Sequence, residues 1–290
     1  MKTYKISWAD HTLELGKRTL VMGVLNVTPD SFSDGGIFFK CDDAVAHGEK
    51  MAMEGADIID IGGESSRPFS EKISVEEELK RTLPVIEKLS SRVSVPISID
   101  TTKAAVAKQA IQAGASVIND ISSLRFDPGM AGIAAEYNVP VILMHMKGTP
   151  ENMQVSPEYD DLIGEVRKFF ENAVENAEKS GIPRSMIIID PGIGFGKTVE
   201  HNLLLIKHLR EFQTLDLPIL AGTSRKAFIR KILGQSSEPD PLSSVAEVGT
   251  QASVAAAALS GAHIVRVHNV ANTCATLKII DAIKSGRGGL

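Results

Sequence analysis

The 290-residue chain has few cysteines, no long apolar run and no excess of basic charge, and each absence excludes a class of protein. Its two cysteines, Cys41 and Cys274, belong to no CxxC or Cys/His pattern, so we expect neither a disulfide framework nor a zinc cluster. No segment approaches the ~18 consecutive apolar residues of a membrane span, and the first residues lack the apolar stretch of a signal peptide. We therefore expect a cytoplasmic protein.

The formal net charge of −5 argues against a nucleic-acid-binding protein, which usually has a basic face. A local basic pocket for a small anion remains compatible with this charge. Two phosphate-binding patterns are also missing, because neither GxGxxG nor GxxxxGK[ST] follows the first predicted strand. We expect small-molecule substrates, and neither a nucleic-acid nor a membrane partner.

Short apolar runs alternate with helical patterns along the chain, of which 43% is hydrophobic. Eight strands are predicted, at residues 21–26, 56–61, 96–100, 116–119, 139–144, 186–190, 218–221 and 263–267. Helices are predicted at residues 43–54, 74–89, 103–113, 160–179, 245–259 and 272–284. Ser74 and Glu77 form the pattern of a capping box at the second helix, and Gly181 should end the fourth in the left-handed conformation. Residues 3–15 alternate weakly and predict a hairpin.

One local pattern occurs three times. Gly55, Gly114 and Gly261 each follow a predicted helix and precede an alanine and then a buried strand. Such direct helix-to-strand turns, repeated in a chain near the ~250 residues of the architecture, predict a (β/α)8 TIM barrel. We expect one α/β domain over residues 1–290, with the hairpin covering the bottom of the barrel. A doubly wound open sheet is the alternative.

Polar and charged residues stand where the predicted strands end. In a barrel these ends converge on one face, so the residues can be considered as a set. They are Asn26, Arg67, Asp100, Asn119, Met144, His145, Asp190, Lys226, Arg266 and His268. Asp100 or Asp190 alone could equally cap the helix that follows. Together, charges of both signs on one rim favour a binding site.

The chemistry of this set suggests two subsites. Carboxylates such as Asp100 and Asp190 accept paired N–H donors, and the Asn119 amide can bind a neighbouring donor and acceptor. These groups suit a planar heterocycle, whereas arginine, lysine and histidine suit phosphate or carboxylate oxygens. Residues 190–197 place three glycines around Phe195, whose ring could stack on a ligand, although a plain turn is an equal alternative.

With these residues assembled, the sequence resembles the dihydropteroate synthases over nearly its whole length. Seven motifs occur in the family's order: VMGVLNVTPDSFSDGG, IIDIGGESSRP, SIDTTK, VINDIS, DPGIGFGKTVEHN, GTSRKAFI and RVHNV. The resemblance implies a (β/α)8 transferase that joins 6-hydroxymethyl-7,8-dihydropterin diphosphate to p-aminobenzoate and releases diphosphate. It also implies a role in folate biosynthesis, a homodimer, Mg²⁺ as cofactor, and sulfonamides as competitors of aminobenzoate.

The resemblance also assigns residues to subsites. The pterin would contact Asp100, Asn119, Ile121, Met144, Asp190, Phe195 and Lys226. The diphosphate would contact Asn26, Arg266 and His268, with Asn26 as the Mg²⁺ ligand. Aminobenzoate would contact Phe32, Ser66, Arg67 and Pro68. Arg67, Lys226, Arg266 and His268 are the residues expected to act in catalysis, which the resemblance implies is dissociative, through a pterin methylene cation.

Three positions depart from the family pattern. Phe69 stands where glycine is common, which should stiffen the second loop. Ala227 replaces a serine whose hydroxyl helps to hold the aminobenzoate carboxylate, although the amides of a helix N-terminus there could still do so. Asn269 replaces a common aspartate after His268.

Three other functions remain open at this point. A methyltransferase that takes a methyl group from a methylated folate would share the pterin residues, but has no need of the two loops or of Arg266 and His268. A Schiff-base lyase could use Lys226. A pterin-binding protein without catalysis is the third alternative.

Overall fold

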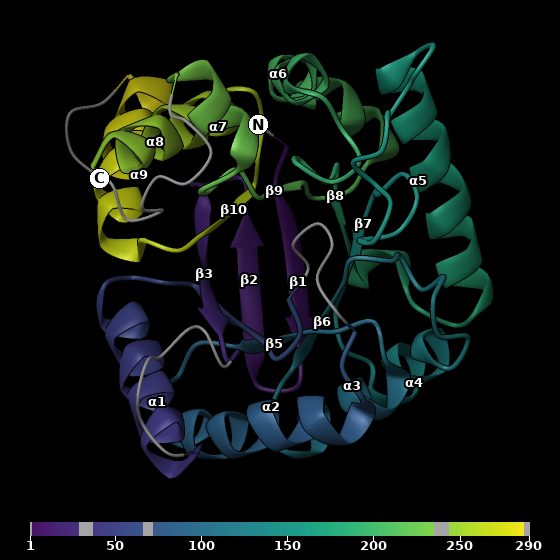
Figure 1. Cartoon of the computed structure of the whole chain (residues 1–290), viewed down its shortest axis with the longest axis vertical. Helices are drawn as coiled ribbons and strands as arrows, with labels where there is room; N and C mark the ends of the chain where they lie inside the picture. Colours follow the sequence, from purple (N-terminus) through teal and green to yellow (C-terminus); the bar gives the residue numbers. More distant parts are fainter. Residues whose placement is uncertain (1, 29–36, 66–71, 235–243, 287–290) are drawn as a thin grey trace.

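The computed structural model describes residues 2–28, 37–65, 72–234 and 244–286 of the chain. Parallel strands circle a central axis, and helices cover them on the outside (Figure 1). The sheet runs in the order β8 (Ile187–Asp190), β7 (Val141–Met144), β6 (Val117–Asp120), β5 (Ile97–Asp100), β4 (Ile58–Gly62), β3 (Leu20–Asn26), β10 (Ile264–Val267), β9 (Leu220–Ala221). A parallel bridge between Ile189 and Ile219 joins the two outer strands. The predicted (β/α)8 barrel is confirmed, and the open sheet is wrong.

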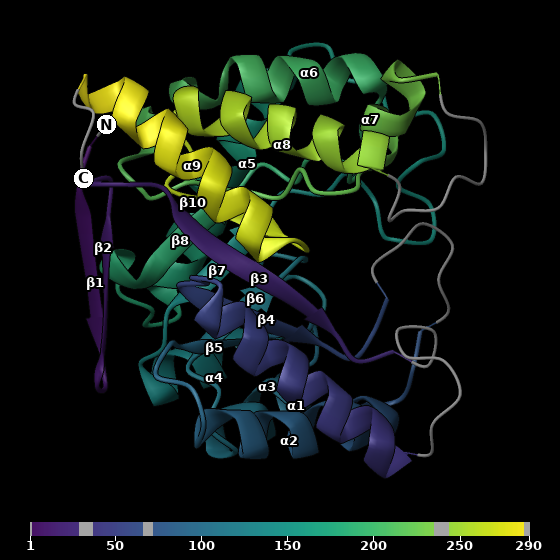
Figure 2. The same ribbon diagram turned by 90° about the vertical axis from the view of Figure 1, so that its left-hand side faces the viewer.

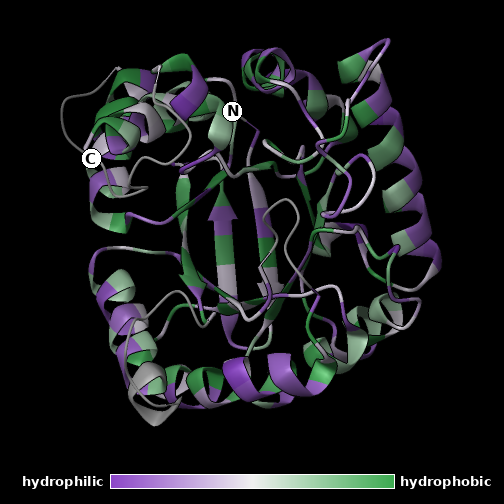
Figure 3. Ribbon diagram, viewed as in Figure 1, coloured by the Kyte–Doolittle hydropathy of each residue, from purple (hydrophilic) through white to green (hydrophobic). Residues whose placement is uncertain are grey.

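The strands are apolar because both of their faces are covered. β3 is buried over all but its last residue, and β4, β6, β7 and β8 are buried throughout. Strands covered on both sides have continuous Val/Ile-rich sequences instead of alternating ones. Figure 3 shows this as hydrophobic colour along the barrel strands. A charged residue inside such a strand therefore needs a partner within the barrel.

Nine helices lie in the described part of the chain: α1 (Ile37–Met53), α2 (Val75–Ser90), α3 (Ala104–Gln112), α4 (Met130–Tyr137), α5 (Leu162–Lys179), α6 (Val199–Lys207), α7 (Ala227–Ile232), α8 (Ser244–Leu259) and α9 (Val270–Ser285). The sequence did not predict α4 or α6, and of α7 it predicted only the start at Ala227, because these helices are short and lack a long apolar stripe. Two short 3-10 helices, η2 (Arg184–Met186) and η3 (Leu209–Leu215), precede β8 and β9. No helix among these residues is both long and apolar enough to cross a membrane.

The three repeated glycine turns share one geometry. Gly55, Gly114 and Gly261 have φ angles of +103°, +116° and +107°, in the left-handed region that glycine adopts without strain. The next amide donates back into the helix in each case, as Ala56 does to the Met51 carbonyl at 3.0 Å. This is the Schellman ending of a helix, and it directs the chain at once into the next strand. Gly181, with φ of +91°, ends α5 in the same region, as predicted.

Half of the predicted capping box at α2 is present. The Ser74 hydroxyl accepts a hydrogen bond from the Glu77 amide at 3.2 Å. The Glu77 carboxylate does not return to Ser74, because it pairs with the Arg81 guanidinium at 2.8 Å. An i,i+4 ion pair on the helix surface thus replaces the reciprocal cap.

The predicted hairpin consists of β1 (Tyr4–Trp8) and β2 (His11–Leu15), which pair antiparallel. It lies at the side from which β3 starts, which is the amino end of the barrel (Figure 2). Trp8 and Leu15 are buried in the main core, and the Lys2 carbonyl lies 3.2 Å from the His263 Nε2 atom, just before β10. The hairpin therefore covers the bottom of the barrel, and the opposite rim, where the strands end, is the place for a site.

Candidate functional site

A buried network of ion pairs and hydrogen bonds spans the carboxyl end of the barrel. Arg266 on β10 donates from Nε to Asp60 Oδ2 at 2.6 Å and from Nη2 to Asp100 Oδ2 at 2.7 Å. Asn119 on β6 donates from Nδ2 to the same Asp60 oxygen at 3.0 Å. One guanidinium thus bridges two carboxylates, and Asp60 orients both Arg266 and Asn119.

Strand register explains how these residues meet. β3 lies between β10 and β4, with Arg266 opposite Met22 on one side and Asp60 opposite Val24 on the other. The two polar side chains are therefore close in space, although 206 positions separate them in sequence. Because the strands are covered by helices outside, these charged side chains find partners within the barrel.

Burial and neighbouring charge set the protonation of this network. Burial raises the pKa of Asp100 to about 7. The positive charge of Arg266 opposes this shift, and the negative charge of Asp60 adds to it. Burial disfavours the Arg266 cation, but Asp60 and Asp100 outweigh it and raise the pKa of the guanidinium above its usual range. Arg266 therefore stays charged, whereas Asp100 is close to its titration point at neutral pH.

Asp190, Lys226 and Phe195 form the neighbouring part of the site. Asp190 ends β8 and accepts a hydrogen bond on Oδ1 from the Gly192 amide at 2.8 Å. The Lys226 ammonium, at the start of α7, lies 4.0 Å from the centre of the Phe195 ring, within the range of a cation–π contact. Burial, together with Arg266, lowers the pKa of Lys226 to about 8, and burial raises the pKa of Asp190.

The predicted apolar residues of the site also come together. Ile121, Met144 and Phe195 share a small buried cluster with Met146 and Met153, separate from the main barrel core. Such a cluster at the rim presents an apolar surface beside the charged network. A flat heterocycle bound there could pack its faces on sulfur and aromatic groups while its edge meets Asp100, Asn119 and Asp190.

Asn26 and His268 lie at other strand ends of this rim. Asn26 is exposed at the end of β3, opposite Gly62. The His268 Nδ1 atom is 3.0 Å from the hydroxyl of Ser224, which holds the imidazole on the β9 side. Asn269, one of the three departures, accepts from the Asn272 amide at 3.1 Å and so caps α9. An asparagine serves this capping function as well as an aspartate.

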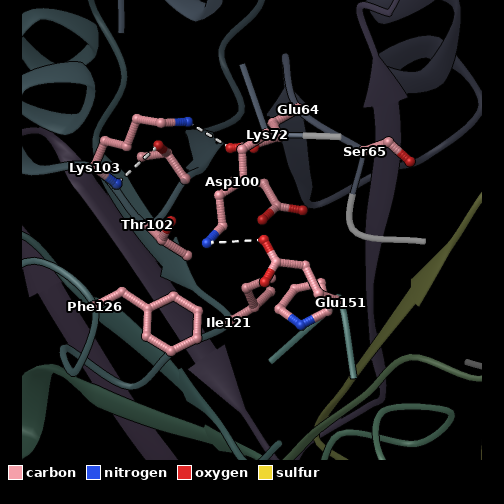
Figure 4. Close-up of a pocket in the computed structure, with 11 residues that line it drawn as sticks. Glu64, Ser65, Lys72, Asp100, Thr102, Lys103, Ile121, Phe126 and Glu151 are labelled. Atoms are coloured by element: carbon pink, nitrogen blue, oxygen red, sulfur yellow. Dashed lines mark hydrogen bonds and ion pairs between the residues drawn. The ribbon is translucent and has the colours of Figure 1, made fainter. Parts of the chain in front are cut away.

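Five predicted or noted positions lie outside the described residues: Phe32, Ser66, Arg67, Pro68 and Phe69. The described chain on either side of residues 66–71 borders a pocket that is open to solvent. Asp100, Ile121 and Phe126 line one part of the pocket, and paired lysine and glutamate side chains line another part (Figure 4).

The polar wall of this pocket is built from ion pairs. Lys103 contacts Glu64 at 2.5 Å, and Lys72 contacts Glu151 at 3.0 Å (Figure 4). Lys103 also contacts the fully buried Glu78 at 2.6 Å. Glu64 also accepts from the Ile73 amide at 3.2 Å. The Glu64 carboxylate thereby connects the described residues before position 66 with those after position 71.

Sequence reasoning missed Asp60, the residue on which the network is centred. The signal in the sequence was a single aspartate among isoleucines in a predicted strand. In the structure the Asp60 side chain is 0% exposed. A carboxylate in that place requires buried donors, and this requirement could have singled it out. Its partners could not have been named, because they depend on the register of β10 and β6.

Comparisons with protein families, with known sequences and with solved structures agree with one another. Residues 22–268 match the family model described as pterin binding enzyme. The dihydropteroate synthase of Synechocystis sp. is 50% identical over 268 residues, which are 92% of this chain and 91% of that protein.

Two solved structures are similar over almost the whole chain. Dihydropteroate synthase of Xanthomonas albilineans with 4-aminobenzoic acid has a TM-score of 0.90 and 43% identity, covering 98% of this chain and 99% of that one. The Yersinia pestis enzyme in a sulfonamide complex has a TM-score of 0.90 and 44% identity, covering 97% and 99%. The chain therefore belongs to the pterin-binding enzyme family and, within it, to the dihydropteroate synthases.

Proposed function

We propose that this protein joins 6-hydroxymethyl-7,8-dihydropterin diphosphate to p-aminobenzoate and forms 7,8-dihydropteroate and diphosphate. The observation that carries the proposal is the buried network of Asp60, Asn119, Arg266 and Asp100 beside an apolar cluster. The Xanthomonas relative was solved with 4-aminobenzoic acid and the Yersinia relative with a sulfonamide, which fits the second substrate.

The pterin would be read along its polar edge. An aminopyrimidinone edge presents several N–H donors and one carbonyl, and Asp100, Asp190 and Asn119 offer the matching groups. Ile121, Met144 and Phe195 would pack on the faces of the ring. Lys226 would contribute a donor near Phe195, above which it already lies.

Bond cleavage in this site would be assisted from both ends. Asp60, Asp100 and Asp190 stabilise positive charge that develops on the pterin methylene group when diphosphate departs. Arg266 and His268 would stabilise the leaving group. Arg266 holds Asp60 and Asp100 through Nε and Nη2, so Nη1 is not engaged in these ion pairs. A guanidinium has enough donors to meet carboxylates and phosphate oxygens together.

Mg²⁺ fits this site as an ion held mainly by substrate. In the part of the chain that the structure describes, no three His, Cys, Asp or Glu side chains gather as a metal cage. Mg²⁺ prefers oxygen ligands and keeps water, so diphosphate oxygens with Asn26 as protein ligand would suit it. When bound, the ion supplies neutralisation of the charge that develops on diphosphate.

Aminobenzoate would bind next to the pterin methylene group, with Phe32, Ser66, Arg67 and Pro68 as its walls. These four assignments rest on the family resemblance, as does the catalytic role of Arg67. Calorimetric titration separates the two subsites. Lys226→Ala and Asp100→Ala should weaken binding of pterin diphosphate, whereas Ser66→Ala should weaken binding of aminobenzoate, and the reverse pattern would contradict the assignment.

We also propose that the protein acts as a homodimer in the cytoplasm. Apolar side chains are exposed on two helices that contact each other: Val248 on α8 is 69% exposed, and Ile279 and Ile283 on α9 are each 63% exposed. A partner subunit would cover them. Light scattering should give twice the chain mass for the wild type and the monomer mass for Ile279→Glu. A monomeric wild type would contradict the dimer.

Diphosphate release tests the reaction itself. The protein is mixed with 6-hydroxymethyl-7,8-dihydropterin diphosphate and Mg²⁺, with and without p-aminobenzoate. Release that depends on aminobenzoate, with dihydropteroate formed, supports the proposal. Binding of the pterin without release would favour a methyltransferase or a non-catalytic binding protein.

A further inference from the structure

A buried lysine outside the substrate-contacting set connects two loops of the site. Lys197 is 3% exposed, and its ammonium lies 2.8 Å from the Phe195 carbonyl, 3.3 Å from the His145 carbonyl and 3.0 Å from His145 Nδ1. An ammonium has three N–H donors, and these acceptors use all of them. Lys197 is therefore directed at the protein and not at a ligand.

The two loops joined by Lys197 are also in close backbone contact. One follows β7 and begins at His145, and the other is the glycine-rich turn of residues 191–197 after β8. A Cβ atom on Gly192 would lie 1.9 Å from the His145 carbonyl oxygen, so the backbones approach as closely as glycine permits. Further along the first loop, the Gln154 side chain donates to the Gly194 carbonyl and the Tyr159 hydroxyl to the Gly196 carbonyl, both at 2.8 Å.

This pair of loops holds several parts of the pterin site. Met144 stands directly before His145, and Phe195 lies within the glycine-rich turn. The Gly192 amide of that turn donates to Asp190. Lys226 rests on the Phe195 ring. A shift of the turn would therefore displace an apolar wall, a partner of the Asp190 carboxylate and the support of the Lys226 ammonium together.

The burial of this charge is costly, which suggests a function beyond stability. Burial lowers the pKa of Lys197 to about 7, although the negative charge of Asp190 opposes this shift. Burial and the charge of Lys197 lower the pKa of His145 to about 2. His145 is thus neutral, and its Nδ1 atom accepts while the proton sits on Nε2. An apolar residue of equal length would fill this space at lower cost.

We propose that Lys197 is a positioning residue for pterin binding, which fixes the loops after β7 and β8 so that Met144 and Phe195 form the walls of the pterin slot. Lys197 does not touch the substrate, and it acts through the Phe195 and His145 carbonyls. The inference rests on the proposed function, because it concerns the affinity of the same pterin site.

The test is Lys197→Met, which keeps the length of the side chain and removes all three donors. Its KM for pterin diphosphate should rise roughly 10-fold, the size expected for lost hydrogen bonds to a charged group, with the KM for aminobenzoate within about twofold. Lys207→Met is the matched control, because Lys207 is exposed at the end of α6. It should behave as the wild type.

A spectroscopic readout separates positioning from general damage. In ¹⁵N NMR the wild-type His145 should show the Nε2–H tautomer, and Lys197→Met should shift the Nδ1 resonance as its donor disappears. A rise of both KM values together, or an unchanged His145 signal with unchanged KM values, would overturn the inference. If the wild type forms no dihydropteroate, the proposed function fails instead.

A second variant covers the case in which Lys197→Met does not fold. Tyr159→Phe removes the hydrogen bond to the Gly196 carbonyl and keeps the aromatic ring. It should raise the KM for pterin diphosphate about threefold, and leave that for aminobenzoate unchanged. Equal KM values in Tyr159→Phe and the wild type would contradict the proposal, because the loops would then need no such connection.

Discussion

The two ends of the barrel are closed by different kinds of interaction. At the amino end, the β1–β2 hairpin covers the barrel with Ile6, Trp8, Leu13 and Leu15, which are all buried. At the carboxyl end, Asp60, Asn119 and Arg266 hold a charged network whose members are at most one-fifth exposed. An apolar core tolerates exchange among apolar residues of similar volume, whereas the charged network depends on every member being present.

This difference indicates which end serves function. Buried ion pairs seldom add stability over an apolar packing of the same volume, because the desolvation of both charges offsets their attraction. A barrel selected for stability alone would have an apolar carboxyl end as well. The polar end is therefore retained for the ligand, and the following predictions test that division.

The largest effect is expected from Arg266→Met. The variant leaves Asp60 buried without its cation, and the unfolding free energy should fall by about 3–5 kcal/mol. Dihydropteroate formation should fall at least 100-fold, since Asp100 and the leaving group also lose a partner. Urea unfolding and a product assay measure the two effects. Arg92→Met, which removes an exposed arginine 3.5 Å from Glu49, is the control and should change neither.

A double variant sharpens this test. Asp60→Leu with Arg266→Met replaces both charges by apolar groups, and it should regain most of the stability lost in the single variant. Activity should remain lost. Recovery of both would show that the network is a structural feature and not part of the site.

Trp8→Ala should destabilise the amino end of the barrel. Trp8 is 3% exposed in the core, and its loss should lower the unfolding free energy by about 3–5 kcal/mol through the cavity left behind. The kcat/KM of the folded fraction should stay within about twofold of the wild type, because the site lies at the other rim. Trp8→Phe, the matched control, should lose much less stability. A large fall in kcat/KM for Trp8→Ala would show that the two ends are coupled.

The most specific prediction concerns pH. The pKa of Asp100 is about 7 in the fold and near 3.8 in the unfolded chain, chiefly because of burial. The folded state thus binds this proton more tightly, so the contribution to stability is full below the unfolded pKa and is lost as pH rises through about 7. Asp100→Asn should remove this part of the pH dependence.

The same carboxyl should govern binding in the opposite sense. Ionised Asp100 accepts N–H donors, so the affinity of the wild type for pterin diphosphate should increase as pH rises through about 7. Calorimetry across this range measures it, and Asp100→Asn should bind weakly without that increase. A wild-type affinity independent of pH would mean that Asp100 does not titrate in the free protein.

Much of the fold could be predicted because its signals are local. The three glycine turns and the apolar strands are specified by a few neighbouring residues, and they imply a barrel by repetition. α4 was missed because it has only eight residues, of which Met130 and Ala134 alone are buried, and this gives little periodicity. The extent of α7 was not predicted, because its six residues are too few to show a helical pattern.

The site was predicted as a set of strand ends but not as a set of contacts. Asp100, Asn119, Asp190 and Arg266 could be placed on one rim from the topology alone. That Arg266 lies between Asp60 and Asp100 depends on the relative register of β10, β4 and β5, which no local pattern reveals. The bond from Lys197 to His145 likewise joins residues 52 positions apart.

The contact between Lys2 and His263 has a consequence for the order in which the protein is made. The two residues are 261 positions apart, so the hairpin leaves the ribosome long before its partner at β10 exists. The apolar residues of the hairpin must then wait through most of translation, when exposed strands are prone to misassembly. The floor of the barrel therefore cannot be completed until β10 has been made.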